Sequence, residues 1–267
     1  MFFLLFFGAT VVANVFARIT SERENQFSWM PDILRRGLNY LHATVVDVLS
    51  LALLALFFPV NLERFDPKRC DPSGGPPILC INGFLGSSNN FIYHRRCLER
   101  AGYKNIFTIN LGHPFQSLEQ YTGRVKKKID TIRKIIGERE LVLIGHSMGG
   151  LIATKLALES SIVITIGTPF KGTKVAKLFS KMSRAVKEMC PNSPYLRNLE
   201  FPTKTCYYHI ANRVDHMVRP SSSAEGPADH EKVVLDATGH IGYLFSSRVS
   251  DSIIKKLQQL TGHRLPV

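Results

Sequence analysis

Residues 141–158, LVLIGHSMGGLIATKLAL, decide how the rest of the chain is interpreted. The apolar run 141–144 predicts a buried strand, and the residues after the central motif predict a helix. Between them, Gly145-His146-Ser147-Met148-Gly149 fits the pattern G-x-S-x-G, which forms a sharp turn when a strand precedes it and a helix follows. Such a turn holds the serine in a strained conformation, with its hydroxyl exposed above the sheet. We therefore predict that Ser147 is a catalytic nucleophile.

Apolar runs alternate with helical patterns through the last two thirds of the chain. Strands are expected over 77–81, 105–109, 141–144, 161–166, 205–210 and 232–235, and helices over 90–101, 118–136 and 243–260. This alternation predicts an α/β fold, with a mainly parallel sheet covered by helices on both faces. Ligands bind beyond the carboxyl ends of the strands in such sheets. The candidate site residues all fall at such ends.

A serine hydroxyl needs a base within hydrogen-bonding distance, and histidine is the usual base because its pKa lies near neutrality. Among nine histidines, His240 is the best candidate, since it follows the last predicted strand in a loop of small residues. His146 lies inside the turn, where we expect a structural role. His216 is expected to be an ordinary loop residue.

The base in turn needs an acid that orients its ring. Asp215 follows the strand predicted over 205–210, which gives the chain order Ser, Asp, His expected on this architecture. Asp229 and Asp236 are the alternatives. Asp236 is nearer to His240 in sequence, but this does not place it beside the correct ring nitrogen.

Two backbone N–H groups are needed to bind an oxyanion. Met148 directly follows the predicted nucleophile at the start of a helix, and its N–H is the first candidate. The second is the N–H of Phe84, in a glycine-containing loop after the first strand. Gly83 lets this loop approach the substrate, and Gly145 and Gly149 leave room where any Cβ would collide.

Taken together, these residues resemble the α/β-hydrolase superfamily, and within it the bacterial triacylglycerol lipases and esterases. The sequence is also similar to GPI inositol-deacylase-like proteins. The resemblance rests on the blocks INGFLGSSNNF, LIGHSMGGLIA, TIGTPFKGT, CPNSPYLRNL, ANRVDHMVRPSSS and GHIGYLF, between residues 76 and 245. It implies that Ser147, Asp215 and His240 form the triad and that Phe84 and Met148 form the oxyanion hole.

Two positions depart from the lipase pattern. Asn82 stands where these lipases usually carry histidine before glycine, and Phe170 replaces a frequent histidine after Thr-Pro. Asn82 can still order the oxyanion loop through its amide, so the departure concerns efficiency more than reaction class. No carboxylate set suggests the calcium that some lipases bind. We expect neither a metal nor a cofactor.

Residues 1–65 differ in composition from the rest of the chain. Residues 1–17 carry no charge, and residues 43–60 carry one, Asp47. Each run is about long enough to cross a bilayer as a helix, for which roughly 17–25 residues are needed. We expect residues 1–65 to associate with a membrane through one or two apolar helices, and residues 66–267 to form the α/β-hydrolase domain.

An alternative is that one or both apolar helices are buried or interfacial. Asp47 favours this, because a carboxylate at the bilayer centre costs roughly 2.5–3.5 kcal/mol. If both helices cross, the arginines between them favour a cytoplasmic loop and an external or periplasmic hydrolase domain. Basic residues directly after the second run, from Arg64 to Arg69, weaken that assignment.

The formal net charge of +13 suits an anionic partner. No nucleic-acid motif is found, so with apolar anchors present we expect an anionic membrane surface and no nucleic acid. Residues 171–189 strengthen this view, because they predict one basic amphipathic helix within a lid-like insertion around 171–200. An ordinary helix packed on the core is the alternative. Cys190 and Cys206 are the one cysteine pair we consider for a disulfide.

The sequence thus predicts a membrane-associated serine hydrolase that cleaves carboxylic esters of lipids through an acyl-enzyme. An acyltransferase, in which an alcohol or amine replaces water, uses the same residues. A non-catalytic, membrane-tethered binding protein on a hydrolase fold is the alternative from another class, since a fold alone does not establish function.

Overall fold

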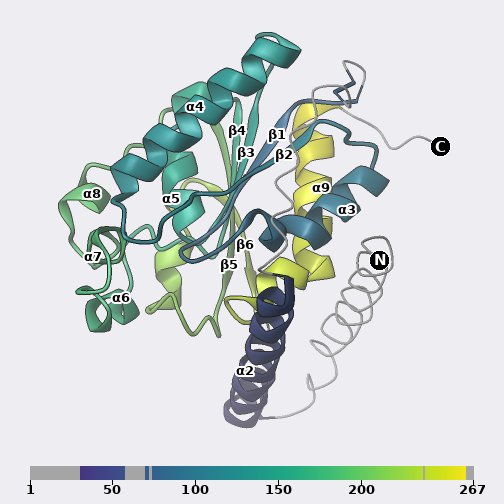
Figure 1. Ribbon diagram of the computed structural model, residues 1–267. Coiled ribbons are helices and arrows are strands. Elements are labelled where there is room, and N and C mark those ends of the chain that lie inside the picture. Colours follow the sequence, from purple (N-terminus) through teal and green to yellow (C-terminus); the bar gives the residue numbers. More distant parts are fainter. Residues whose placement is uncertain (1–30, 58–69, 72–73, 237, 263–267) are drawn as a thin grey trace.

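The computed structural model describes residues 31–57, 70–71, 74–236 and 238–262, which form a three-layer α/β arrangement (Figure 1). Six parallel strands pair in the order β2-β1-β3-β4-β5-β6. Their bounds are β1 Ile78–Ile81, β2 Ile106–Ile109, β3 Val142–His146, β4 Ile162–Ile166, β5 Cys206–Asn212 and β6 Glu231–Leu235. The predicted α/β fold with a parallel sheet is confirmed.

Helices cover both faces of this sheet (Figure 1). On one face lie α4 (Leu118–Ile136) and α5 (Met148–Lys155), and on the other lie α3 (Ile92–Arg100) and α9 (Ser247–Thr261). Alternate strand residues supply the two cores: Leu79 and Leu143 face the α4 side, whereas Ile78 and Ile144 face the α9 side. The strands are therefore apolar on both faces, as expected for a covered parallel sheet.

The predicted helix over 118–136 matches α4 in both bounds. Ser117 caps its start, because its hydroxyl accepts the N–H of Gln120 while the Gln120 side chain accepts the N–H of Ser117. Gly137 ends the helix with φ 77. Single-turn 3₁₀ segments precede α3 and α9, namely η2 (Ser88–Phe91) and η5 (Gly242–Phe245).

The prediction of one continuous helix over residues 171–189 is wrong. Two short helices are present instead, α6 (Lys174–Leu178) and α7 (Arg184–Glu188), followed by α8 (Pro194–Arg197). Ser183 breaks the pattern with an extended backbone, φ −157 and ψ 151, and its hydroxyl donates to the carbonyl of Pro114 at 2.9 Å. A tertiary contact thus overrides the helical periodicity.

The apolar side chains of this segment divide into two groups. Ala176, Ala185, Val186 and Met189 join the main core, whereas Leu178, Phe179 and Met182 are exposed by 80%, 48% and 48%. Part of the segment is therefore packed on the core, and part of its apolar face is exposed. Its lysines and arginine, from Lys174 to Lys187, are exposed.

Cys190 and Cys206 are free thiols.

A 26-residue helix, α2 (Asp32–Phe57), forms near the N-terminus. It begins well before the apolar run at residue 43, so Arg35 and Arg36 are helical rather than part of a linker. Over Asp32–Ala55, α2 is long and apolar enough to cross a membrane, as judged within the described residues. Its C-terminal half lies against η5 and η2, with Ala43, Val46, Asp47 and Ser50 buried. The other predicted apolar run, residues 1–17, lies outside the described residues.

Candidate active site

Ser147 sits on a strained turn between β3 and α5. Its backbone has φ 54 and ψ −122, and its N–H donates to the carbonyl of Ile166 at 2.8 Å. A non-glycine residue with positive φ is uncommon and marks strain that the surroundings must enforce. The turn therefore presents Ser147 at the carboxyl end of β3, in the middle of the sheet.

Close backbone packing enforces this turn. An ideal Cβ placed on Gly149 would lie 2.2 Å from the carbonyl oxygen of Ile81, and one on Gly145 would lie 2.5 Å from the Gly149 backbone. Neither gap admits a side chain, because real Cβ contacts are never this short. Both glycines are therefore required where β1, β3 and α5 meet.

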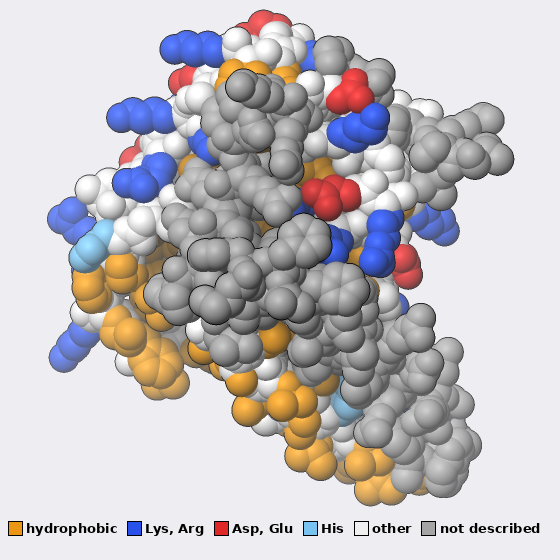
Figure 2. All heavy atoms as spheres, turned by 45° about the vertical axis from the view of Figure 1, so that its right-hand side comes forward, with side chains coloured by type: hydrophobic (Ala, Val, Ile, Leu, Met, Phe, Trp, Pro, Cys, Tyr) orange, Lys and Arg blue, Asp and Glu red, His pale blue; other side chains and the backbone are white. Residues whose placement is uncertain are grey.

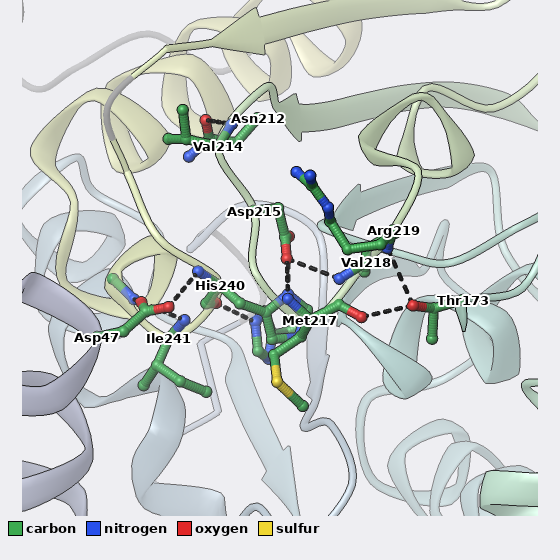
Figure 3. Close-up of polar contacts among 12 residues, drawn as sticks. Asp47, Thr173, Asn212, Val214, Asp215, Met217, Val218, Arg219, His240 and Ile241 are labelled. Atoms are coloured by element: carbon green, nitrogen blue, oxygen red, sulfur yellow. Dashed lines mark hydrogen bonds and ion pairs between the residues drawn. The ribbon is translucent and has the colours of Figure 1, made fainter. Parts of the chain in front are cut away.

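Asp215 and His240 come together at the same edge of the sheet. His240 Nδ1 lies 2.8 Å from Asp215 Oδ2, and both side chains are buried (Figure 3). The other carboxylate oxygen of Asp215 accepts the N–H groups of Met217 and Val218, each at 2.8 Å. Because Asp215 engages Nδ1, the Nε2 atom of His240 is left to act on a third group.

The environment of His240 favours its protonated form. Burial lowers the pKa of His240, but the Asp215 charge and hydrogen bond, together with the Asp47 charge, outweigh this and raise the pKa above its ordinary value. Such a partnership stabilises an imidazolium, which a general base becomes after it has accepted a proton.

His146 lies beside this pair. Its Nε2–H donates to the carbonyl of His240 at 3.0 Å, and the two ring centroids are 4.9 Å apart. Burial and the nearby His240 hold the pKa of His146 well below its ordinary value, so the ring stays neutral.

The loop after β1 approaches the serine closely. An ideal Cβ on Gly83 would lie 3.0 Å from Ser147 Cβ and 3.3 Å from His146 Nδ1. Asn82 is buried, and its amide donates to the Gly83 carbonyl at 3.1 Å. Gly83 thus brings the loop that carries Phe84 against the serine turn. Met148 occupies the first position of α5, where a backbone N–H has no acceptor within the helix.

The alternative acids lie elsewhere. The Asp236 carboxylate pairs with Arg213, at 2.5 Å from Arg213 Nη1. Asp229 acts electrostatically on His230.

His216 contacts α2, with its ring centroid 4.4 Å from that of Tyr40. Thr173, just before α6, binds the loop that carries Asp215. Its hydroxyl donates to the Met217 carbonyl and accepts the Arg219 N–H (Figure 3).

One residue of this site was not foreseen from the sequence. Asp47 of α2 accepts the N–H groups of His240, Ile241 and Gly242 at 2.8–2.9 Å (Figure 3). The only signal in the sequence was a single carboxylate in an otherwise uncharged apolar run.

Within the described residues, no group of three or more His, Cys, Asp or Glu side chains is arranged to hold a metal ion.

Comparison with known proteins agrees with this fold. Residues 76–183 match the family described as the alpha/beta hydrolase fold. The mature form of Bacillus licheniformis lipase BlEst2 superimposes with a TM-score of 0.57 at 19% identity, covering 70% of this chain and 93% of that one. The chain therefore has an α/β-hydrolase fold and is similar to lipases and esterases.

Two curated proteins show more local similarity to this chain. The sn-1-specific diacylglycerol lipase ABHD11 of Xenopus tropicalis is 30% identical over 89 residues, which are 32% of this chain and 28% of that protein. Lecithin-cholesterol acyltransferase-like 4 of Arabidopsis thaliana is 28% identical over 111 residues, which are 36% of this chain and 20% of that protein. The matches thus span 20–28% of the length of these relatives.

Proposed function

We propose that this protein is a membrane-associated serine hydrolase that cleaves carboxylic esters of lipids. The observation that carries the proposal is the strained turn at Ser147, set at the same sheet edge as the buried Asp215–His240 pair. The lipase named among its relatives and the lipase among its structural neighbours agree with this substrate class.

In the proposed mechanism, Ser147 Oγ attacks the acyl carbonyl while His240 Nε2 accepts the serine proton. The N–H groups of Phe84 and Met148 bind the resulting oxyanion, and loss of one such donor typically costs about 10²–10³-fold in rate. His240 then donates its proton to the leaving alcohol, which yields the acyl-enzyme. Water, activated by His240, attacks this ester and releases the fatty acid.

Exposed apolar side chains support a lipid-facing orientation. Outside α2, nearly all large exposed ones follow the carboxyl end of a strand, namely Leu85, Phe115, Leu178, Phe179, Met182 and Met217. We call these six residues the apolar rim. The six residues belong to connections that leave the carboxyl edge of the sheet, which also carries Ser147, and exposed lysines lie between Lys174 and Lys187. Apolar contacts combined with basic charge suit an anionic membrane surface.

Helix α2 supplies further apolar surface. Ile33, Leu34, Leu41, Val45, Val48, Leu49 and Leu51 are all more than 45% exposed. Figure 2 shows hydrophobic side chains gathered at the lower end of the molecule, where α2 extends. Contiguous exposed apolar surface of this kind marks an interaction site, and we assign it to lipid.

The decisive experiment is labelling with a fluorophosphonate probe, which reacts with activated serines. We expect the detergent-solubilised full chain to be labelled, S147A to be unlabelled and S222A, which alters an exposed serine, to be labelled as wild type. Hydrolysis of a diacylglycerol should follow the same pattern. An unlabelled wild-type chain, or equal labelling of S147A, would refute the proposal.

An acyltransferase remains the second candidate, since a relative is named for acyl transfer. The two reactions share the acyl-enzyme and differ only in the acceptor. Product analysis with glycerol present separates them: free fatty acid indicates hydrolysis, and new acylglycerol indicates transfer.

A further inference from the structure

We propose that Asp47, on the N-terminal helix α2, is a positioning residue that holds the His240 loop in its catalytic geometry. Helix α2 then positions an active-site loop in addition to associating with a membrane. The inference rests on the proposed serine hydrolase function and deepens it.

The geometry at Asp47 is that of a cap supplied by a distant segment. One carboxylate oxygen accepts the N–H of His240 at 2.9 Å, and the other accepts those of Ile241 and Gly242, each at 2.8 Å. These N–H groups lie at the start of η5, where helical backbone leaves donors without partners. Asp47 thus fixes the backbone of the residue that carries the proposed base.

The surroundings fit this contact closely. An ideal Cβ on Gly239 would lie 2.1 Å from Asp47 Oδ1, and one on Gly242 would lie 2.6 Å from Val46 Cγ1. The loop can approach α2 only because both positions are glycine. Asp47 itself is 8% exposed, and Ala43 and Ser50, on the same side of the helix, are fully buried. A buried carboxylate is retained when it is fully hydrogen-bonded.

The same helix also contacts the loop that carries Asp215. Thr44 Oγ1 lies 3.2 Å from His216 Nε2, and the Tyr40 ring meets the His216 ring edge-on at 4.4 Å. One helix therefore touches the residue after the proposed acid and the backbone of the proposed base. Its position constrains both members of the buried pair.

Asp47 also contributes charge. The ionisable groups that face His240 are Asp215, Asp47, His146 and Tyr243. The two carboxylates favour the imidazolium, so removing the charge of Asp47 lowers the pKa of His240. This electrostatic effect distinguishes Asp47 from a residue that merely adds stability.

The test compares D47N with S50A in the full chain. Asparagine keeps the size of Asp47 but loses the charge and turns an N–H₂ group toward the loop. We expect D47N to lower kcat by about 100-fold with KM nearly unchanged, as a small misplacement of a catalytic group does. The acid limb of its pH–rate profile should move to lower pH. S50A changes a buried side chain on the same helix and should behave as wild type.

Active-site titration with the fluorophosphonate probe counts the folded, competent enzyme in each sample. A lower kcat can then be distinguished from a smaller amount of folded enzyme. If D47N folds poorly, D47E takes its place: its carboxylate is displaced, so kcat should fall while the acid limb stays near that of wild type. A labelled wild type whose D47N or D47E variant keeps the wild-type kcat per active site overturns the positioning role alone. An unlabelled wild type overturns it together with the proposed function.

Discussion

His146 Nε2 lies 3.0 Å from the carbonyl oxygen of His240, so the last residue of β3 is joined directly to the loop of the proposed base. The carbonyl is an acceptor, which places the His146 proton on Nε2. Within the described part of the chain, Nδ1 of this buried ring has no hydrogen-bond partner. A neutral imidazole is the only form that suits these surroundings.

We therefore expect H146A to reduce activity although the residue takes no part in proton transfer. Loss of the donor to the His240 carbonyl should lower the free energy of unfolding by about 1–3 kcal/mol. Loosening of the loop should lower kcat by up to about 100-fold. Thermal unfolding and labelling rate measure the two effects. H113A, which removes an exposed histidine, should change stability by less than about 0.5 kcal/mol.

The pH dependence of labelling should report His240 alone. A base must be neutral to accept the serine proton, so activity is lost as the pH falls below the pKa of His240. That pKa is raised, since Asp215 and Asp47 outweigh the burial that lowers it. The midpoint of the acid limb should therefore lie above about 6.5, the ordinary histidine value. A midpoint clearly below this value would show that Asp215 does not support the base.

D215N tests the same partnership by substitution. The amide cannot hold the imidazole in the required tautomer, and the analogous change in a serine protease triad lowers kcat by about 10⁴-fold. We expect a loss of this size, with the remaining activity showing an acid limb at lower pH. D236N is the matched control, because Asp236 pairs with Arg213 instead of His240. If D236N were the more damaging change, the acid would have to be reassigned.

The sequence could predict this much of the site because each proposed triad residue lies in the connection that follows a strand. Parallel strands end at one edge of a sheet, so topology alone puts Ser147, Asp215 and His240 at the same edge. The apolar runs that define the strands are local, and they located all six of them within a few residues.

The contacts that were missed are those that depend on tertiary packing. Asp47 and His240 are 193 positions apart, and no periodicity links an apolar helix to a loop at the other end of the chain. The break between α6 and α7 has a similar origin, since it depends on the hydrogen bond from Ser183 to Pro114. The local sequence pattern favoured a continuous helix there, but the contact with the residues before α4 interrupts it.

Two glycine-to-alanine substitutions separate packing from helix propensity. Gly149 lies where a Cβ would meet the Ile81 carbonyl at 2.2 Å, so G149A should cost about 3 kcal/mol or more. Gly123 lies inside α4, and nothing is within 4 Å of an added Cβ. G123A should therefore stabilise the protein by up to about 1 kcal/mol. Thermal unfolding in detergent measures both, and equal effects would contradict the packing at the turn.

The apolar rim predicts that membrane binding depends on side chains beside the active site. L178D combined with F179D removes two exposed apolar groups and adds negative charge near the basic segment. We expect this variant to bind vesicles of anionic phospholipid more weakly and to hydrolyse diacylglycerol in them more slowly. Its hydrolysis of a soluble short-chain ester in detergent should be unchanged, because neither residue belongs to the proposed triad.

Leu158 provides the matched control for this experiment. It is 76% exposed, like Leu178, but it belongs to the 3₁₀ turn Ala157–Glu159, which precedes β4 at the opposite edge of the sheet. L158D adds one negative charge away from the rim, where the double variant adds two, and should bind vesicles as wild type. Sedimentation with vesicles of increasing anionic lipid content measures the difference. If the rim variant and L158D bound equally well, α2 or the segment before it would have to supply the whole membrane contact.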